Sequence, residues 1–239
     1  TNRVLRLYNI LVKLESDAFS FVDEAVELAI KNGVTGNPVL PKSAAVQFIP
    51  FDEGVFPQVL PHRADDAWRS GHPQLRMDVA ENVVTLQAGR YDVNSDLILP
   101  KTHRLVIEPG TTLRLAKDVA IGVYRGIDVR GTQDAPVVIT AQNPQEPFGS
   151  LGILGDGQTT STLQHLHVSG GYERWVAGVY FSGAVSIHDH ASVSLDHCRF
   201  ENNLADDGLN VKHAEKVVIS NCVFRDNAAD QIDLDFCQG

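Results

Sequence analysis

The spacing of apolar residues along the chain changes near residue 76. Across residues 4–31, apolar side chains from Leu7 to Ile30 recur at intervals of three and four residues, which predicts helix. Asn32-Gly33 then provides a helix stop, and residues 34–73 carry many prolines and scattered apolar positions. We therefore interpret residues 1–75 as a helical and extended segment that caps the rest of the chain.

From residue 76 onward, short β-rich runs follow one another, with Gly, Asn, Asp and Pro turns between them. The runs do not alternate with long helical patterns, which disfavours a doubly wound sheet, and two-residue hairpin turns do not join them, which disfavours a sandwich. The predicted strands include residues 83–86, 97–99, 104–107, 112–115, 126–129, 136–140, 163–168, 179–181 and 185–187.

Two segments near the C-terminus repeat each other at an offset of 24 residues. Residues 193–203 align with residues 217–227, and Cys198, Phe200 and Asn203 meet their counterparts Cys222, Phe224 and Asn227. A strand that returns at such a period is typical of a β-solenoid.

The repeated residues have structural interpretations. Cys198 and Cys222 should stack in the core as free thiols, because side chains on parallel strands fit disulfide torsion poorly. The phenylalanines should form an apolar ladder, and burial stabilises each large side chain by ~1.5–3 kcal/mol. Asn203 and Asn227 should end their strands, adopt the left-handed backbone of a sharp turn and bond to each other.

Several segments resemble bacterial right-handed parallel β-helix proteins of the pectate-lyase type. Residues 104–115, 126–132 and 135–140 look like their N-terminal coils, and residues 161–171 look like the coil that follows. The Cys-x-Phe-x-x-Asn units at 198–203 and 222–227 look like their repeats, and residues 198–239 also resemble the β-helix module of spore-coat-H-type surface proteins.

The resemblance implies an all-β solenoid: a right-handed, single-stranded parallel β-helix of six or seven coils over residues 76–239, with an N-terminal helical cap. Similar proteins include polysaccharide lyases, glycoside hydrolases, epimerases and adhesins. The last residues, Asp233–Gly239, lie within a coil pattern, so we expect pairing there with further coils or with another chain.

Composition narrows the range of partners. The 239 residues carry a formal net charge of −10, which argues against nucleic acid, since phosphate binding needs a basic surface. No apolar run is long enough to predict a transmembrane helix.

Acidic side chains gather in the C-terminal coils. Residues 207–212 align with residues 230–235 at an offset of 23, and residues 178–182 are expected to form the equivalent strand of the preceding coil. Alternation then predicts two outward columns: Tyr180, Asn210 and Asp233; and Ser182, Lys212 and Asp235. Asp206, Asp207 and Asp230 fall in the turn before the strand.

This arrangement admits three kinds of chemistry. Asp230, Asp233 and Asp235 could hold Ca²⁺ through carboxylate oxygens. Lys212 beside Asp233 and Asp235 could act as the base of a β-elimination, or two carboxylates could hydrolyse a glycoside. The structural alternative pairs Lys212 with Asp235 across neighbouring strands, an interaction worth only ~0–1 kcal/mol at a surface.

Histidines form a second candidate group: His165, His167, His188, His190 and His197. Imidazoles can ligate Zn²⁺, but no established zinc motif accompanies them, and an exposed polar role is the simpler interpretation. His165, His197 and Asn221 are expected to share one column of successive coils.

Tyr172, Trp175 and Tyr180 follow Gly170-Gly171 and form an aromatic group. They could stack on a sugar beside the sheet, or the tryptophan could pack against the helical segment.

Together, these patterns favour a carbohydrate-interacting β-helix protein of the extracellular space, the periplasm or the cell surface, with polysaccharide bound on an acidic lateral face. A non-enzymatic structural or adhesion module is the first alternative, and a polysaccharide lyase or glycoside hydrolase is the second.

Overall fold

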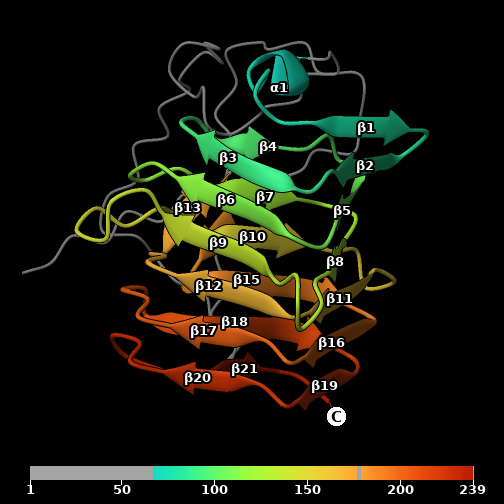
Figure 1. Ribbon diagram of the computed structural model, residues 1–239. Helices are drawn as coiled ribbons and strands as arrows, with labels where there is room; N and C mark the ends of the chain where they lie inside the picture. The colour runs from blue at the N-terminus through green and yellow to red at the C-terminus, as the bar shows by residue number, and fades with distance from the viewer. Residues whose placement is uncertain (1–66, 177–178, 239) are drawn as a thin grey trace, which may run out of the picture. The chain divides into compact units, whose positions relative to one another are not determined.

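The computed structural model describes residues 67–176 and 179–238, so the predicted helix over 4–31 lies outside the described part of the chain. The described part opens with a short helix, α1 (Ala67–Ser70), and a strand, β1 (Met77–Ala80). Strand β1 pairs antiparallel with β2 (Val83–Leu86). From β2 onward, the chain winds through stacked coils of parallel strands (Figure 1).

Three sheets run along the stack, and each coil contributes one strand to each sheet in turn. Sheet 1 contains β1, β2, β5 (Arg104–Ile107), β8 (Ile127–Arg130), β11 (Thr160–Gln164), β16 (Ser192–Asp196) and β19 (Val217–Ser220). Sheet 2 contains β3 (Gly89–Val93), β6 (Thr111–Leu115), β9 (Val137–Ala141), β12 (Leu166–Ser169), β17 (Arg199–Glu201) and β20 (Val223–Arg225). Sheet 3 contains β4 (Leu97–Ile98), β7 (Ile121–Val123), β10 (Leu151–Leu154), β15 (Gly183–His190), β18 (Asp207–Ala214) and β21 (Asp233–Asp235).

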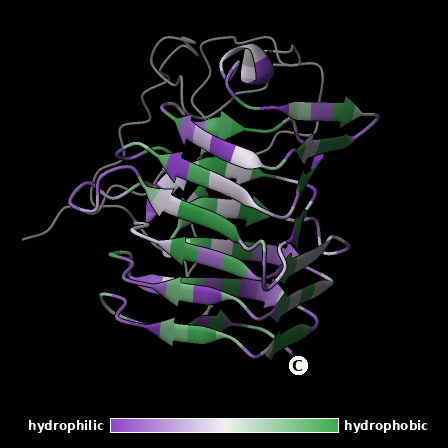
Figure 2. Ribbon diagram, in the orientation of Figure 1, coloured by the Kyte–Doolittle hydropathy of each residue, from purple (hydrophilic) through white to green (hydrophobic). Residues whose placement is uncertain are grey.

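The described residues thus form six coils, which confirms the predicted parallel β-helix architecture. The 24-residue register is also confirmed, because Leu195 pairs with Ile219 and Phe200 pairs with Phe224. The two phenyl rings stack with centroids 5.1 Å apart and planes 4° from parallel. Figure 2 shows apolar and polar residues along the strands, and the apolar side chains at alternating positions are buried.

Cysteines take part in this core without forming disulfides among the described residues. Cys198 is fully buried, and its backbone N–H donates to the sulfur of Cys222 at 3.4 Å. The predicted role of both residues as stacked core thiols is therefore confirmed.

Residues with a left-handed backbone conformation form corners between the sheets. His165, His197 and Asn221 occupy the corner between sheets 1 and 2 in three successive coils, each with φ between 44° and 53°. The apolar run predicted as one strand over 163–168 is therefore bent at His165, which separates β11 from β12.

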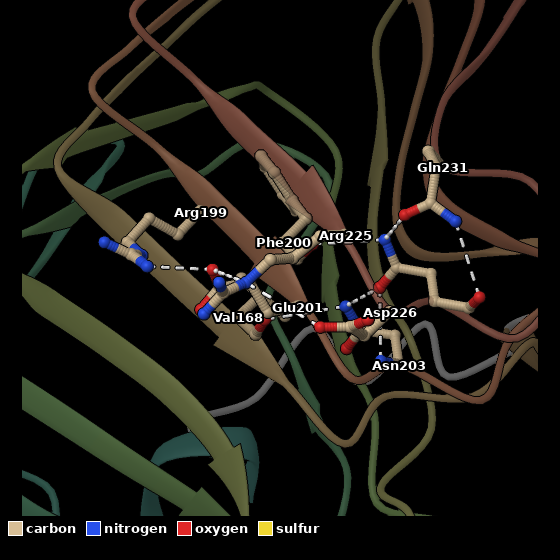
Figure 3. A network of polar contacts seen from close by, with 9 residues as sticks. Val168, Arg199, Phe200, Glu201, Asn203, Arg225, Asp226 and Gln231 are labelled. Atoms are coloured by element: carbon tan, nitrogen blue, oxygen red, sulfur yellow. Dashed lines mark hydrogen bonds and ion pairs between the residues drawn. The ribbon is translucent and has the colours of Figure 1, made fainter.

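The corner between sheets 2 and 3 corrects one prediction. Asn203 and Asn227 were expected to adopt the left-handed backbone, but Asn202 and Asp226, one residue earlier, have φ of 56° and 55°. This places the Asn203 side chain inside the coil, where its Nδ2 donates to Oδ1 of Asn227 at 2.9 Å. The predicted asparagine ladder is confirmed (Figure 3).

Charged residues of sheet 2 extend this network on the outside. Glu201 accepts from Arg199 at 2.9 Å and lies 2.8 Å from Arg225 of the next coil (Figure 3). The pKa of Glu201 is lowered, chiefly by the hydrogen bond from Arg199. This face of the coil stack is therefore occupied by paired charges.

A hairpin interrupts the coil between β12 and β15. Strands β13 (Arg174–Val176) and β14 (Val179–Phe181) pair antiparallel and belong to none of the three sheets. The prediction that residues 178–182 supply the sheet 3 strand of this coil is wrong, because β15 takes that place and Ser186 pairs with Asn210. The apolar residues of β14 pack against the outer face of the coil and not in its interior. The alternation of apolar residues in the sequence is the same in both cases.

Candidate functional site

The hairpin β13–β14 presents an exposed aromatic pair. Trp175 and Tyr180 face each other across the two strands, and their ring centroids lie 5.4 Å apart. Trp175 keeps 64% of its surface exposed and Tyr180 keeps 42%. Tyr172, just before β13, is also exposed. The predicted aromatic group is thus brought together on the surface of the described part of the chain. Packing of the tryptophan against the helical segment stays a prediction, because that segment lies outside the described residues.

The opposite side of the hairpin is fixed to sheet 3. Phe181 and Val176 are buried in a small apolar cluster with Ala120 of the coil stack. Phe181 lies directly over Gly152 of β10, where an added Cβ would fall 2.5 Å from the ring. One face of the hairpin is therefore anchored by packing, which leaves the face with Trp175 and Tyr180 free to contact a ligand.

The hairpin ends beside an acidic corner, defined here as Asp206, Asp207, Asp230 and Asp233. Ser182, the residue after β14, accepts a backbone hydrogen bond from Asp207, and its hydroxyl donates to Oδ2 of Asp207 at 2.7 Å. The backbone N–H of Asp230 donates to the carbonyl of Asp206 at 2.8 Å, which joins the corner across two coils. These contacts confirm the predicted clustering of Asp206, Asp207 and Asp230, and Asp233 joins it through its pairing with Asn210.

Negative charge accumulates at this corner without neutralisation. Asp207 is only 2% exposed, and its pKa is raised, first by burial and then by the charges of Asp233, Asp206 and Asp230, against the hydrogen bond from Ser182. The pKa of Tyr180 is raised by partial burial and by Glu173, Asp206 and Asp207. Within the described residues, none of the four corner acids has an ion-pair partner. The aromatic pair and the acidic corner therefore share one electrostatic environment.

Asn210 connects the corner to a buried histidine. Its Nδ2 lies 3.4 Å from Oδ2 of Asp233 and donates to it, so its Oδ1 accepts from Nε2 of His188 at 3.0 Å. Burial lowers the pKa of His188, which keeps the imidazole neutral, and Phe181 packs on its ring at 5.1 Å. Asn210 lies in the predicted outward column with Asp233, since Leu209 and Val211 on either side of it are in the core. Its neighbour in the preceding coil is Ser186 of β15 and not the predicted Tyr180, and its side chain is only 2% exposed.

Lys212 and Asp235 form the second predicted column. They pair in register, and Nζ of Lys212 lies 4.0 Å from Oδ2 of Asp235, with both side chains about two-fifths exposed. The residue before them in this column is His188, not Ser182 as predicted. This loose surface pair matches the structural alternative for Lys212, which gains ~0–1 kcal/mol from it.

The histidines serve the coil in different ways. His165 and His197 stack at their corner with ring centroids 4.8 Å apart, as the predicted column requires. His190 is fully buried and shares a hydrogen bond with Ser161 at 2.9 Å, while its Nδ1–H donates to the carbonyl of His188 at 2.7 Å. Because that carbonyl can only accept, Nε2 of His190 must be the acceptor from Ser161. His188 and His190 thus lie inside the structure, not on an exposed turn.

Metal binding was predicted for two of these groups. Across residues 67–176 and 179–238, no group of three or more His, Cys, Asp or Glu side chains is arranged to hold a metal ion. The Ca²⁺ site considered at Asp230, Asp233 and Asp235 and the Zn²⁺ site considered at the histidines stay predictions.

Sequence reasoning missed two residues beside the aromatic pair. Glu173 influences Tyr180 electrostatically, and its Oε2 is buried without a hydrogen-bond partner. Leu204 is exposed, and its backbone N–H donates to the carbonyl of Gly171, which brings it next to the start of the hairpin. The proximity of Glu173 to the aromatic residues in the sequence was a usable signal, whereas Leu204 is placed only by the coil register.

A family model described as a pectate-lyase like beta helix domain matches residues 78–201, which is more than half of the chain. The chain belongs to this family. No curated protein and no solved structure matches it. The matched part of this pectate-lyase-like protein includes the aromatic hairpin and ends just before the acidic corner. The resemblance of residues 198–239 to spore-coat-H-type modules stays a prediction.

Among the described residues, no helix is long and apolar enough to cross a membrane.

Proposed function

We propose that this pectate-lyase-like β-helix protein binds a carbohydrate polymer on the surface formed by the hairpin and the acidic corner, and that it acts in the secreted space or at the cell surface. The proposal includes right-handed winding of the coils, as the family resemblance implies. The observation that carries it is the Trp175–Tyr180 pair, anchored from behind by Phe181 and exposed in front.

The physical argument rests on the cost of exposing aromatic surface. Large apolar side chains that stay exposed beside polar groups are typical of binding sites rather than of inert surface. A Trp and a Tyr add a rigid apolar face with polar groups at its edge, which suits a sugar ring with its C–H face and hydroxyl rim. The structural alternative, an adhesion or scaffold module, does not explain why this hairpin keeps its two largest rings in solvent.

The test is binding to a panel of neutral, acidic and amino polysaccharides by Trp175→Ala and Tyr180→Ala variants. We expect the unmodified protein to bind at least one polymer and both variants to lose about tenfold in affinity or more, as loss of a central aromatic contact does at other interfaces. Phe236→Ala is the matched control, because Phe236 is also an exposed aromatic residue but stacks on His213 at another corner.

The carbohydrate proposal fails if no polymer binds, or if the Phe236 variant loses as much affinity as the Trp175 variant. A structural module without a binding site would give the first result. Non-specific adsorption to apolar surface would give the second.

One observation favours hydrolysis as a second candidate function. The pKa of Asp207 is raised by burial and by neighbouring carboxylates, which is the property of a general acid in glycoside hydrolysis. Asp233 would be the partner carboxylate. If hydrolysis occurs, Asp207→Asn should abolish the release of reducing ends while binding persists; unchanged release in this variant would contradict the assignment. β-Elimination by Lys212 has weaker support, because Asp235 lies beside its ammonium group.

A further inference from the structure

We propose that the carbohydrate bound at this surface is a polymer of amino sugars with free ammonium groups, and that the acidic corner excludes uronic acids. This inference deepens the proposed function and rests on it. It concerns the sign of charge that the surface selects, which the aromatic pair alone does not determine.

The first argument is the charge balance around the aromatic pair. Every charged group that perturbs Tyr180 is an acid or another tyrosine: Glu173, Asp206, Asp207 and Tyr172. Asp207 in turn is perturbed by Asp206, Asp230 and Asp233. Lys212 lies beyond the corner, with its ammonium group beside Asp235. Arg174, the cation next to Trp175 in β13, is paired with Asp96 at 2.6 Å. A uronate that stacked on Trp175 and Tyr180 would therefore bring its carboxylate toward acids that no cation neutralises.

The second argument is that these acids lack the partners that acids elsewhere on the coil stack have. On sheet 2, Asp92 pairs with Arg114 at 3.0 Å and Glu201 lies between Arg199 and Arg225. At the corner, the hydrogen-bond partners are neutral: the Ser182 hydroxyl for Asp207 and the Asn210 amide for Asp233. A buried polar oxygen without a hydrogen bond is costly, and Oε2 of Glu173 is buried without one in the described chain, although Tyr172 interacts with the same carboxylate.

The third argument is that an ammonium group suits both halves of the surface. A cation near the face of a Trp or Tyr ring is attracted by the ring electrons, and a carboxylate attracts it more strongly still. A sugar stacked on Trp175 with its amine toward Asp206 and Asp230, both exposed, would satisfy these preferences together. A neutral sugar would use only the rings.

The experiment compares three oligomers of equal length: β-1,4-linked glucosamine, its fully N-acetylated counterpart and galacturonate. Binding is measured by calorimetry at mildly acidic pH, where sugar amines are protonated and exposed carboxylates remain ionised. Salt is held at about 0.15 M, where screening beyond ~8 Å suppresses long-range attraction to the net charge. We expect glucosamine to bind about tenfold more tightly than its acetylated form, a ratio that corresponds to ~1.4 kcal/mol, and galacturonate not to bind.

The decisive variant is Asp206→Asn combined with Asp230→Asn. It should reduce the preference for free amines to about twofold or less while binding of the acetylated oligomer stays unchanged, because removal of exposed charge affects only the ionic contacts. The control is Asp134→Asn combined with Glu215→Gln, which removes the same net charge from exposed residues at other corners and should preserve the preference.

Three outcomes separate this inference from the proposed function. Equal binding of both glucosamine forms overturns the inference but leaves carbohydrate binding intact, provided that Trp175→Ala weakens both. Failure of all three oligomers to bind overturns the inference, and it overturns the proposed function as well only if no other polymer of the panel binds. Binding of a lysine-rich peptide that matches glucosamine and survives Trp175→Ala would overturn the sugar assignment in favour of a cationic protein partner.

Discussion

At the scale of single residues, each corner between sheets 2 and 3 divides two tasks between adjacent residues. In one coil, Asn202 adopts the left-handed backbone that turns the chain, and its side chain is exposed. Asn203 is fully buried: its Oδ1 accepts from the N–H of Gly171, and its Nδ2 reaches Asn227. One residue type is therefore used there for two different physical properties, backbone tolerance and hydrogen-bond capacity.

This division predicts opposite sensitivities for the two positions. Asn203→Ala should lower the free energy of unfolding by about 2–3 kcal/mol, because buried backbone groups lose their partners. Asn202→Gly should change it by about 0.5 kcal/mol or less, since glycine adopts positive φ without strain. Urea unfolding followed by circular dichroism measures both; a larger loss for Asn202→Gly would contradict the assignment.

Buried histidines predict a loss of stability in acid. Burial lowers the pKa of His188 and of His190, so both stay neutral in the folded protein. The unfolded chain binds protons below about pH 6.5 and the folded one does not, so the free energy of unfolding falls as pH drops through that value. The loss ends below the folded-state pKa of each group.

Thermal unfolding between pH 7.5 and pH 5 tests this prediction, with a limit of about 1.4 kcal/mol per group for each pH unit. His190→Gln should show a shallower decrease than the unmodified protein. His188→Gln provides a second comparison if the first variant is too unstable. Identical slopes in all three proteins would mean that other groups cause the pH dependence.

At the scale of elements, the hairpin is an insertion that the coil stack accommodates with small residues. Gly152 leaves room on the outer face of sheet 3 for the ring of Phe181, and Ala120 and Gly122 lie under the same cluster. Central strands are seldom rich in glycine, because glycine weakens a strand unless something approaches closely. Here the Phe181 ring of the hairpin approaches Gly152 closely.

A double-mutant cycle tests the contact. Gly152→Ala should destabilise the protein by about 1–3 kcal/mol, because the added Cβ would fall 2.5 Å from the Phe181 ring, which must then move. In a Phe181→Leu background, the same change should cost at least about 1 kcal/mol less, which is the size of coupling expected for residues in contact. Additive effects in chemical denaturation would show that the hairpin does not rest on Gly152.

At the scale of the whole described coil stack, stability depends on the neighbours above and below each coil. Phe200 is fully buried between its neighbours, whereas Phe224 in the last coil is only partly buried and Leu234 is 46% exposed. In such quasi-one-dimensional proteins, each coil is stabilised through its nearest neighbours. The coil whose apolar side chains are least covered should therefore open most readily.

Hydrogen exchange of this chain measures that gradient. Backbone amides of β19, β20 and β21 should exchange faster than those of β8, β9 and β10, because none of the side chains of β19–β21 is fully buried in this chain. Uniform protection along the stack would indicate that the coils unfold as one cooperative unit.

Prediction from the sequence succeeded where one coil resembles the next. The offsets of 24 and 23 residues placed Phe200 on Phe224 and Asn210 on Asp233, because stacking preserves spacing. It failed at Tyr180, because the alternating residues of β14 have the same pattern whether they are buried inside a coil or against its outer face. The acidic cluster could be predicted, but its proximity to the aromatic pair depended on that insertion.

The strands of the hairpin pair with none of the three sheets, and this has an implication for engineering. The residues that contact ligand in our proposal lie on a loop whose length does not affect the pairing of β12 with β17 or of β15 with β18. Recognition can therefore diverge among related proteins by exchange of one short segment while the supporting ladders stay fixed. The corner that contains Leu204 and Asp206, one coil further along, is the natural place to graft a second hairpin and double the length of polymer held.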